Sequence, residues 1–86
     1  MYTLAYEKRI YKDLDRIPKE DLDKIAACFE ELRHDPRKPG SEKLTGKPNR
    51  YKIRKGNYRI VYIIEDQIKT VKIMLVRHRK DIYRKR

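Results

Sequence analysis

The spacing of the hydrophobic residues changes along this chain from a helical period to a strand period. This change constrains the possible folds more than any other feature of the sequence. Ile10, Leu14 and Ile17 fall at i, i+4 and i+7, which is one stripe of an amphipathic helix. From Arg50 onwards the apolar residues alternate or fill β-branched runs, as in YRIVYIIE and IKTVKIMLV, and such runs are typical of strands. A helical part followed by a strand-rich part indicates an α+β fold.

Turn and capping signals divide the chain into elements. Residues 2–6 alternate like a short strand, and Pro18 separates the first helical stripe from a second one that ends at Asp35-Pro36. The inner face of the second helix is expected to carry Leu22, Ile25, Ala26, Phe29 and Leu32. Residues 36–49 hold three of the four prolines and two of the three glycines and are expected to be a loop. Lys55-Gly56-Asn57 is a turn signal between two strands.

We therefore predict one domain, residues 1–86, with the order β-α-α-β-β-β. It would be a small antiparallel sheet with a two-helix hairpin on one face and a short basic C-terminal tail or helical turn. A hairpin covers only one face of a sheet, yet the last two strands are apolar on both faces. Some apolar sheet surface should therefore remain for a partner or line a concave site; the residues concerned are Val61, Ile63, Val71 and Ile73.

The charge of the chain is strongly polarised. The net charge is +11, but residues 1–35 carry seven basic and nine acidic residues, whereas residues 36–86 carry seventeen basic and four acidic ones. The front half is thus at −2 and the back half at +13. Such asymmetry points to a polyanionic partner, such as nucleic acid or the ribosome.

Several classes of protein are excluded or disfavoured. Cys28 is the only cysteine, so we expect a buried apolar side chain and neither an internal disulfide nor a cysteine metal site. No run of 18 apolar residues and no secretory leader occurs, which favours a cytoplasmic protein without membrane contact. No carboxylate pair suits a two-metal nuclease and no phosphate-binding glycine loop is present, so we expect no metal and no cofactor.

Three basic clusters are expected to converge at one end of the predicted sheet. Lys52 and Arg54 share a strand face by alternation, Arg59 follows across the turn, and a third group stands where the last strand ends. That third group consists of His78, Arg79 and Tyr83. Converging cations suit phosphoryl chemistry because guanidinium groups bind the charge that develops on phosphate oxygens. A metal-free ribonuclease would use the 2′-OH of the RNA itself as nucleophile, with a base, an acid and fixed positive charge.

The base and acid are not decided by the sequence. His78 is a natural proton shuttle, with a reference pKa near ~6.5. Lys52 and Tyr83 start near ~10.4 and ~10, and a crowd of cations lowers both pKa values. Alone, each basic residue is more often solvated surface, so pattern alone reaches only a basic α+β domain that binds RNA or DNA.

The stretches KLTGKPNRYKIRKGNYRIVYIIED and VKIMLVRHRKDIYR resemble the RelE/ParE toxin superfamily, and IPKEDLDKI fits the same pattern, so the resemblance covers nearly the whole chain. It implies a RelE-type toxin of a type II toxin–antitoxin system, which cuts mRNA in the ribosomal A site without metal. The implied functional residues are Lys52, Arg54, Arg59, Arg79 and Tyr83, with His78 beside them. Basic residues around them are expected to contact RNA: Lys47, Arg50, Lys55, Arg77, Lys80 and Arg84.

One residue departs from the best-known RelE pattern. Arg54 stands where that pattern has lysine, and arginine binds phosphate but does not deprotonate. Arg54, Arg59 and Arg79 are therefore assigned to phosphate and transition-state binding. Lys52, His78 and Tyr83 share the proton transfers in a division left open, and Tyr83 has the alternative of stacking on a base.

Two other functions compete with this reading. One is a ParE-like toxin that inhibits DNA gyrase without RNA chemistry, and the other is a non-catalytic RNA- or ribosome-binding module. The resemblance also implies a cognate antitoxin, with which the toxin can form a hetero-oligomer. An acidic, partly disordered antitoxin segment would suit the basic surface and the apolar strand faces.

Overall fold

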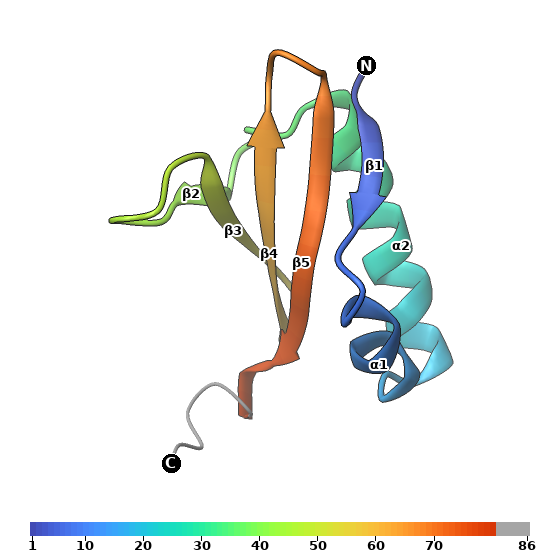
Figure 1. Ribbon diagram of the computed structural model, residues 1–86. Helices are drawn as coiled ribbons and strands as arrows, with labels where there is room; N and C mark the ends of the chain where they lie inside the picture. Colours follow the sequence, from blue (N-terminus) through green and yellow to red (C-terminus); the bar gives the residue numbers. More distant parts are fainter. Residues whose placement is uncertain (81–86) are drawn as a thin grey trace.

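Two helices cover one face of a five-stranded sheet in residues 1–80, the part of the chain that the computed structural model describes (Figure 1). The elements are β1 (Thr3–Tyr6), α1 (Ile10–Asp15), α2 (Lys19–His34), β2 (Glu42–Lys43), β3 (Arg50–Lys55), β4 (Tyr58–Glu65) and β5 (Thr70–His78). The predicted α+β fold and its two helices are confirmed. The predicted basic tail beyond Lys80, with Tyr83 and Arg84, lies outside the described residues.

Helix α2 begins and ends at the prolines that the sequence offers as helix boundaries. Pro18 is the N-cap of α2 in an extended conformation, with φ −58° and ψ 151°, and acidic side chains occupy the first turn, where they favour the positive end of the helix dipole. Asp35, which precedes Pro36, leaves the helical region at φ −150°. The inner face of α2 buries Ile25, Cys28, Phe29 and Leu32. Ala26, expected on that face, is exposed instead.

The sheet is mixed rather than antiparallel, which corrects the prediction. Its strand order is β1-β5-β4-β3-β2. The pairs β2–β3, β3–β4 and β4–β5 are antiparallel, but β1 runs parallel to β5, from Thr3 opposite Thr70 to Tyr6 opposite Ile73. The segment 36–49, predicted as a loop, contains the short edge strand β2. Both features depend on pairing between distant segments, which local patterns do not report.

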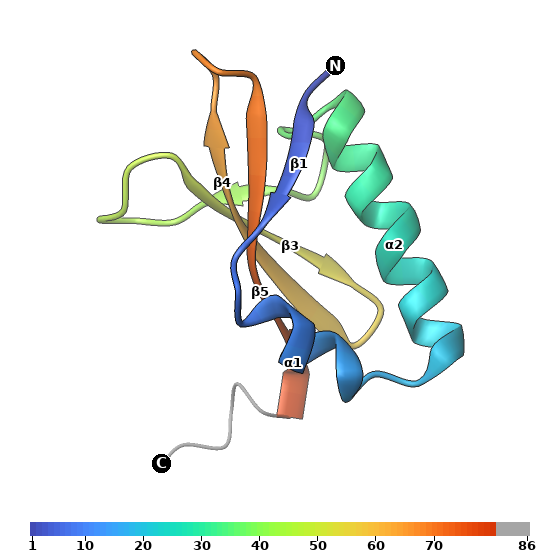
Figure 2. The ribbon, with the colours of Figure 1, turned by 45° about the vertical axis from the view of Figure 1, so that its right-hand side comes forward.

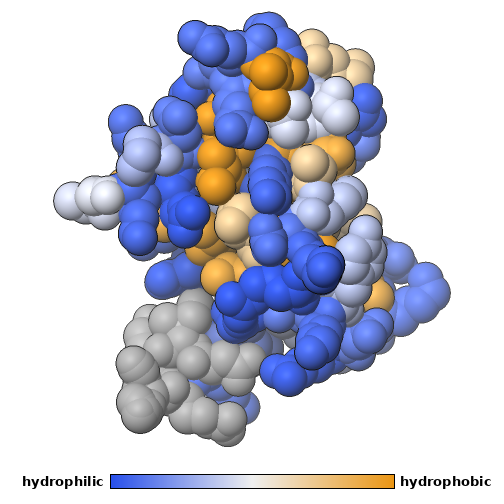
Figure 3. Space-filling view, viewed as in Figure 1, coloured by the Kyte–Doolittle hydropathy of each residue, from blue (hydrophilic) through white to orange (hydrophobic). Residues whose placement is uncertain are grey.

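The two faces of the sheet differ in what covers them. The face under the helices buries alternate residues of the central strands: Tyr58, Ile60, Tyr62 and Ile64 of β4, and Val71, Ile73 and Val76 of β5. The opposite face, called here the open face, carries the half-buried Val61 and Ile63 of β4. Only part of the expected apolar excess therefore lies outside the core. Figure 3 shows apolar surface in the middle of the viewed side, with hydrophilic side chains around it.

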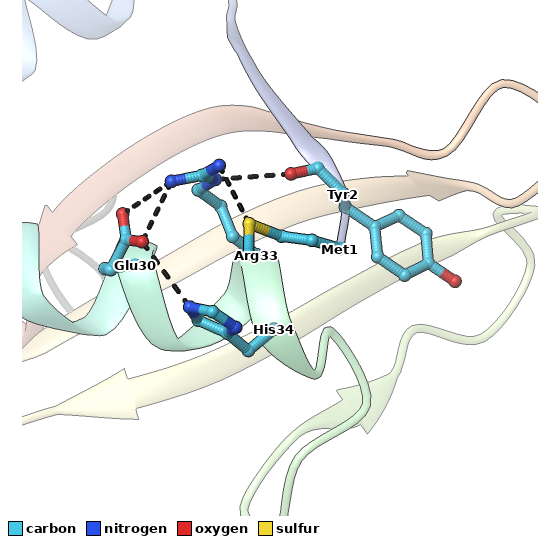
Figure 4. A network of polar contacts seen from close by, with 5 residues as sticks. All are labelled: Met1, Tyr2, Glu30, Arg33 and His34. Carbon is cyan, nitrogen blue, oxygen red and sulfur yellow. Dashed lines mark hydrogen bonds and ion pairs between the residues drawn. The ribbon is translucent and has the colours of Figure 1, made fainter.

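The amino terminus is held against the end of α2 (Figure 4). The Tyr2 backbone N–H donates to the carbonyl of Arg33 at 2.8 Å, and Arg33 Nε donates back to the carbonyl of Tyr2 at 3.2 Å. Arg33 Nη1 also pairs with Glu30 at 2.8 Å. These contacts fix β1 between α2 and β5, at the edge of the sheet.

Candidate functional site

Three arginines form a straight row across the open face. The strand register places Arg54 of β3 directly opposite Arg59 of β4, and Arg59 directly opposite Arg77 of β5. Directly opposed residues share a face, with Cβ atoms about 4.5–5.5 Å apart. We call Arg54, Arg59 and Arg77 the arginine row. The side chains of Arg54 and Arg59 make no hydrogen bond or ion pair with residues 1–80.

Lys52 lies one step from this row on the same face. It precedes Arg54 by two residues and stands opposite Val61. Its Nζ lies 3.3 Å from Oε1 of Glu42, a residue of the edge strand β2 that the sequence did not predict. The predicted neighbourhood of Lys52, Arg54 and Arg59 is therefore present, with a carboxylate beside the lysine that a bound phosphate would have to displace or repel.

Arg77 carries a partner that sequence reasoning missed. Its Nη1 donates to Oδ1 of Asp13 at 2.5 Å, and the Val76 backbone N–H donates to Oδ2 of the same carboxylate at 3.1 Å. Asp13 is only 8% exposed. The signal in the sequence was its position: Asp13 follows Ile10 by three residues and precedes Ile17 by four, so it lies on the apolar side of α1.

His78 lies on the other face of the sheet, which corrects the expected single cluster. It pairs with Tyr58, whose side chain is buried under the helices, and the two rings meet edge to face with centroids 5.1 Å apart. His78 Nδ1 accepts the Lys80 backbone N–H at 3.1 Å. The ring lines a cavity of about 310 Å³ between α1 and the end of β5, together with Asp13, Arg16 and Arg77. Neighbouring strand residues start from opposite faces, but Arg77 reaches Asp13 of α1 around the edge of β5 and so meets His78 at this cavity.

The remaining predicted residues are distributed over both faces. Arg50 stands on the open face opposite Ile63, and its Nε is buried with no hydrogen-bond partner among the described residues. Lys55 pairs with Tyr58 and so shares the helix-covered face. Lys47 is exposed in the loop before β3.

Arg79 and Lys80 are exposed just beyond β5. The backbone N–H of Arg79 donates to the Asn57 carbonyl at 2.7 Å, which holds the chain beside the β3–β4 turn. The register nevertheless makes Arg77, not Arg79, the residue opposite Arg59. The catalytic roles expected for Arg79 and Tyr83 stay predictions, and Tyr83 and Arg84 lie outside the described residues.

Residues 1–80 contain no group of three or more His, Cys, Asp or Glu side chains that could hold a metal ion. Neither of the two helices in that range is long and apolar enough to span a membrane.

These features define a class: a small α+β protein with two helices on one face of its sheet and cationic side chains on the other. Comparison with known proteins identifies the family within that class. Residues 4–83 match the model of the ParE toxin of type II toxin–antitoxin systems. The chain is 32% identical over 85 residues to the toxin RelG of Mycobacterium tuberculosis, which covers 98% of each protein.

Solved structures agree with this assignment. The RelBE2 toxin–antitoxin complex of M. tuberculosis matches with a TM-score of 0.80 and 28% identity, over 90% of this chain and 96% of the other. The isolated Escherichia coli RelE toxin matches with a TM-score of 0.79 and 26% identity, over 91% of this chain and 84% of the other. A chain of the RelB–RelE complex of Methanococcus jannaschii matches with a TM-score of 0.76 and 32% identity, over 92% of this chain and 94% of the other. The chain belongs to the RelE/ParE superfamily of toxins of type II toxin–antitoxin systems, as the resemblance implied.

Proposed function

We propose that this toxin is a metal-independent endoribonuclease that cleaves messenger RNA in the ribosomal A site. The observation that carries the proposal is the arginine row on the open face. Arginines opposed on three neighbouring strands can supply guanidinium groups that bind a phosphate and the charge that grows on its oxygens in the transition state. A substrate on the ribosome implies a cytoplasmic protein.

In this reaction the 2′-OH loses its proton and attacks the adjacent phosphorus, and the 5′-oxygen of the next nucleotide leaves with a proton. The products are a 2′,3′-cyclic phosphate and a free 5′-OH. We assign Arg54, Arg59 and Arg77 to the phosphate, with Arg79 in the same role beyond the strand end. Lys52, His78 and Tyr83 remain the candidates for proton transfer. The position of Lys52 beside the arginine row favours it over His78.

A cognate antitoxin is the proposed partner, in a hetero-oligomer with the toxin. The relatives from M. tuberculosis and M. jannaschii were solved as toxin–antitoxin complexes. The open face offers the half-buried Val61 and Ile63 beside cationic residues, a surface that an acidic amphipathic segment would complement.

The test is a translation extract with purified toxin, in which primer extension maps cuts on the message. We expect cuts on translated mRNA with the natural sequence. Arg59→Ala should slow cleavage about 100- to 1,000-fold, the usual effect of removing one transition-state donor. Arg9→Ala removes the same charge from an exposed position before α1 and should change the rate less than about threefold.

A ParE-like gyrase inhibitor is the second candidate, because the matching family model is that of the ParE toxin. Intact message together with gyrase-dependent DNA breaks would overturn the nuclease proposal in favour of this one. Intact message with tight toxin binding to ribosomes or RNA would overturn it in favour of a non-catalytic binding module.

A further inference from the structure

The buried carboxylate of Asp13 joins α1 to the end of β5. In Figures 1 and 2, α1 lies beside the carboxyl-terminal end of β5. β1 pairs with β5 only as far as Ile73, so among residues 1–80 no strand pairs with the outer edge of β5 at Val76. One oxygen of Asp13 accepts the Val76 N–H at 3.1 Å, in place of a strand neighbour, while the other accepts Nη1 of Arg77 at 2.5 Å.

The carboxylate engages only part of the guanidinium group. Arg77 Nη1 contacts Asp13 and, at 3.4 Å, the Val76 carbonyl. Nε and Nη2 make no hydrogen bond with residues 1–80. Those two nitrogens form one edge of the guanidinium fork, and such an edge can bind two oxygens of a phosphate at once.

Repulsion among the three arginines explains why Arg77 needs an acidic partner. Arg77 stands opposite Arg59, which stands opposite Arg54, so three like charges crowd one line and repel one another. A long arginine side chain without a partner would turn away from its neighbours. A carboxylate at the outer end of the row holds one guanidinium in place and offsets part of the repulsion.

We propose that Asp13 is a positioning residue, which holds the Arg77 guanidinium at the end of the arginine row with its Nε–Nη2 edge available to the RNA phosphate. The inference rests on the proposed nuclease function for its kinetic consequence, but the hold of Asp13 on Arg77 can be measured without any RNA.

Asp13→Asn separates this role from a merely structural one. The amide oxygen can still accept the Val76 N–H, whereas the charge that anchors Arg77 is lost. Asp15→Asn is the matched control, because Asp15 is exposed on the same helix, its substitution removes the same charge, and its side chain makes no hydrogen bond or ion pair with the described residues.

The kinetic experiment is single-turnover cleavage on ribosomes loaded with mRNA, at saturating and subsaturating toxin. Both variants gain one unit of net positive charge, so neither should bind RNA or ribosomes more weakly. Asp13→Asn should lower the saturating rate about 10- to 100-fold, as expected for a misplaced binding group, while Asp15→Asn stays within about twofold of the natural protein. Equal rates for the two variants, both folded, would overturn the proposal.

A second measurement keeps the inference separate from the proposed function. The Arg77 guanidinium N–H signals should show hindered rotation by NMR in the natural protein and in Asp15→Asn, and averaged rotation in Asp13→Asn. Unchanged hindrance in Asp13→Asn overturns the positioning role whatever the activity. If RNA stays intact with the natural protein but the signals change as expected, the nuclease proposal fails and the anchoring of Arg77 by Asp13 stands.

Discussion

The phenol of Tyr62 shows how one buried polar atom links two parts of this fold. Its side chain is fully buried, and its hydroxyl donates to the Pro36 carbonyl at 2.7 Å. The bond ties the central strand β4 to Pro36, the second residue after the end of α2. Tyr62→Phe should lower the free energy of unfolding by about 1 kcal/mol, because the Pro36 carbonyl loses its donor inside the protein. Urea unfolding measures this, and Tyr11→Phe, at a 63% exposed side chain, should have no effect.

The same residue predicts a loss of stability in alkali. Burial raises the pKa of Tyr62 from 10.0 to about 12. A group whose pKa is higher in the folded state contributes stability that is complete below the unfolded value and declines as pH rises through the folded one. The contribution of Tyr62 should therefore fall between pH 10 and about 12, and Tyr62→Phe should flatten that decline. An identical alkaline profile for the two proteins would contradict this account.

At the scale of elements, one polar cluster connects three segments that are distant in sequence. Asp66, in the turn between β4 and β5, accepts Arg37 Nη2 at 2.8 Å and the Tyr2 hydroxyl at 2.7 Å. Arg37 Nε also donates to the Tyr51 hydroxyl at 3.2 Å. The cluster joins the amino terminus, the segment after α2 and the β4–β5 turn. The side chains of Tyr2, Arg37 and Asp66 are all partly solvent-exposed, so screening limits what each contact contributes.

Protonation of Asp66 at low pH should break the contacts of this cluster. The guanidinium of Arg37, and then the hydroxyl of Tyr2, lower the pKa of Asp66 from 3.8 to about 2. Because the folded value is the lower one, the stabilisation is present above pH 3.8 and is lost as pH falls towards 2. Asp66→Asn should melt below the natural protein at pH 6, with the gap in Tm closing by about pH 2. Glu65→Gln, at an exposed neighbour without side-chain contacts in the described chain, should show no such gap.

The β3–β4 turn sets the register of the candidate site. Gly56 has φ +59°, a conformation that glycine adopts without strain and that is common at the first central position of a two-residue hairpin turn. With Lys55 opposite Tyr58, Arg54 must stand opposite Arg59. A slip of one residue would send these arginines to different faces.

At the scale of the whole molecule, charge is separated between two sides. The helical first 35 residues carry −2, whereas the remaining residues carry +13. Figure 2 shows the helices gathered on one side of the sheet, so the open face carries its cations away from most of the acidic residues. This arrangement favours the approach of a polyanion, which the proposed function takes to be RNA, from the open face.

Binding to an uncleavable single-stranded RNA, with 2′-O-methyl sugars, should therefore weaken steeply with salt. Each phosphate that the protein neutralises contributes a slope of about −0.7 in a plot of log affinity against log salt. Arg54→Ala and Arg59→Ala should each reduce the magnitude of the slope by about that amount, while Lys24→Ala on the exposed side of α2 should leave it unchanged. Filter binding at several salt concentrations measures the slopes, and equal slopes for all three variants would count against the arginine row as the RNA contact.

The sequence alone was sufficient for whatever depends on neighbours along the chain. The break at Pro18, the turn at Gly56 and the alternation of Lys52 and Arg54 all report local backbone geometry, and the structure agrees with each. Ile10 and Ile17 are both buried as their stripe predicts, although α1 ends at Asp15, before Ile17. The polarity of the charge is a property of composition and needs no structure.

Only the tertiary structure decided which distant segments meet. The parallel pairing of β1 with β5, the edge strand that brings Glu42 to Lys52, and the placement of Arg77 opposite Arg59 all arise from contacts between residues far apart in sequence. His78 was expected to converge with the arginines, but its pairing with Tyr58 puts it on the helix-covered face, because alternation assigns faces only once the strand register is known. The role of Asp13 could not be predicted for the same reason. A carboxylate on an apolar helix stripe is recognisable in the sequence, but its partners, Val76 and Arg77 at the edge of β5, are brought beside it only by folding.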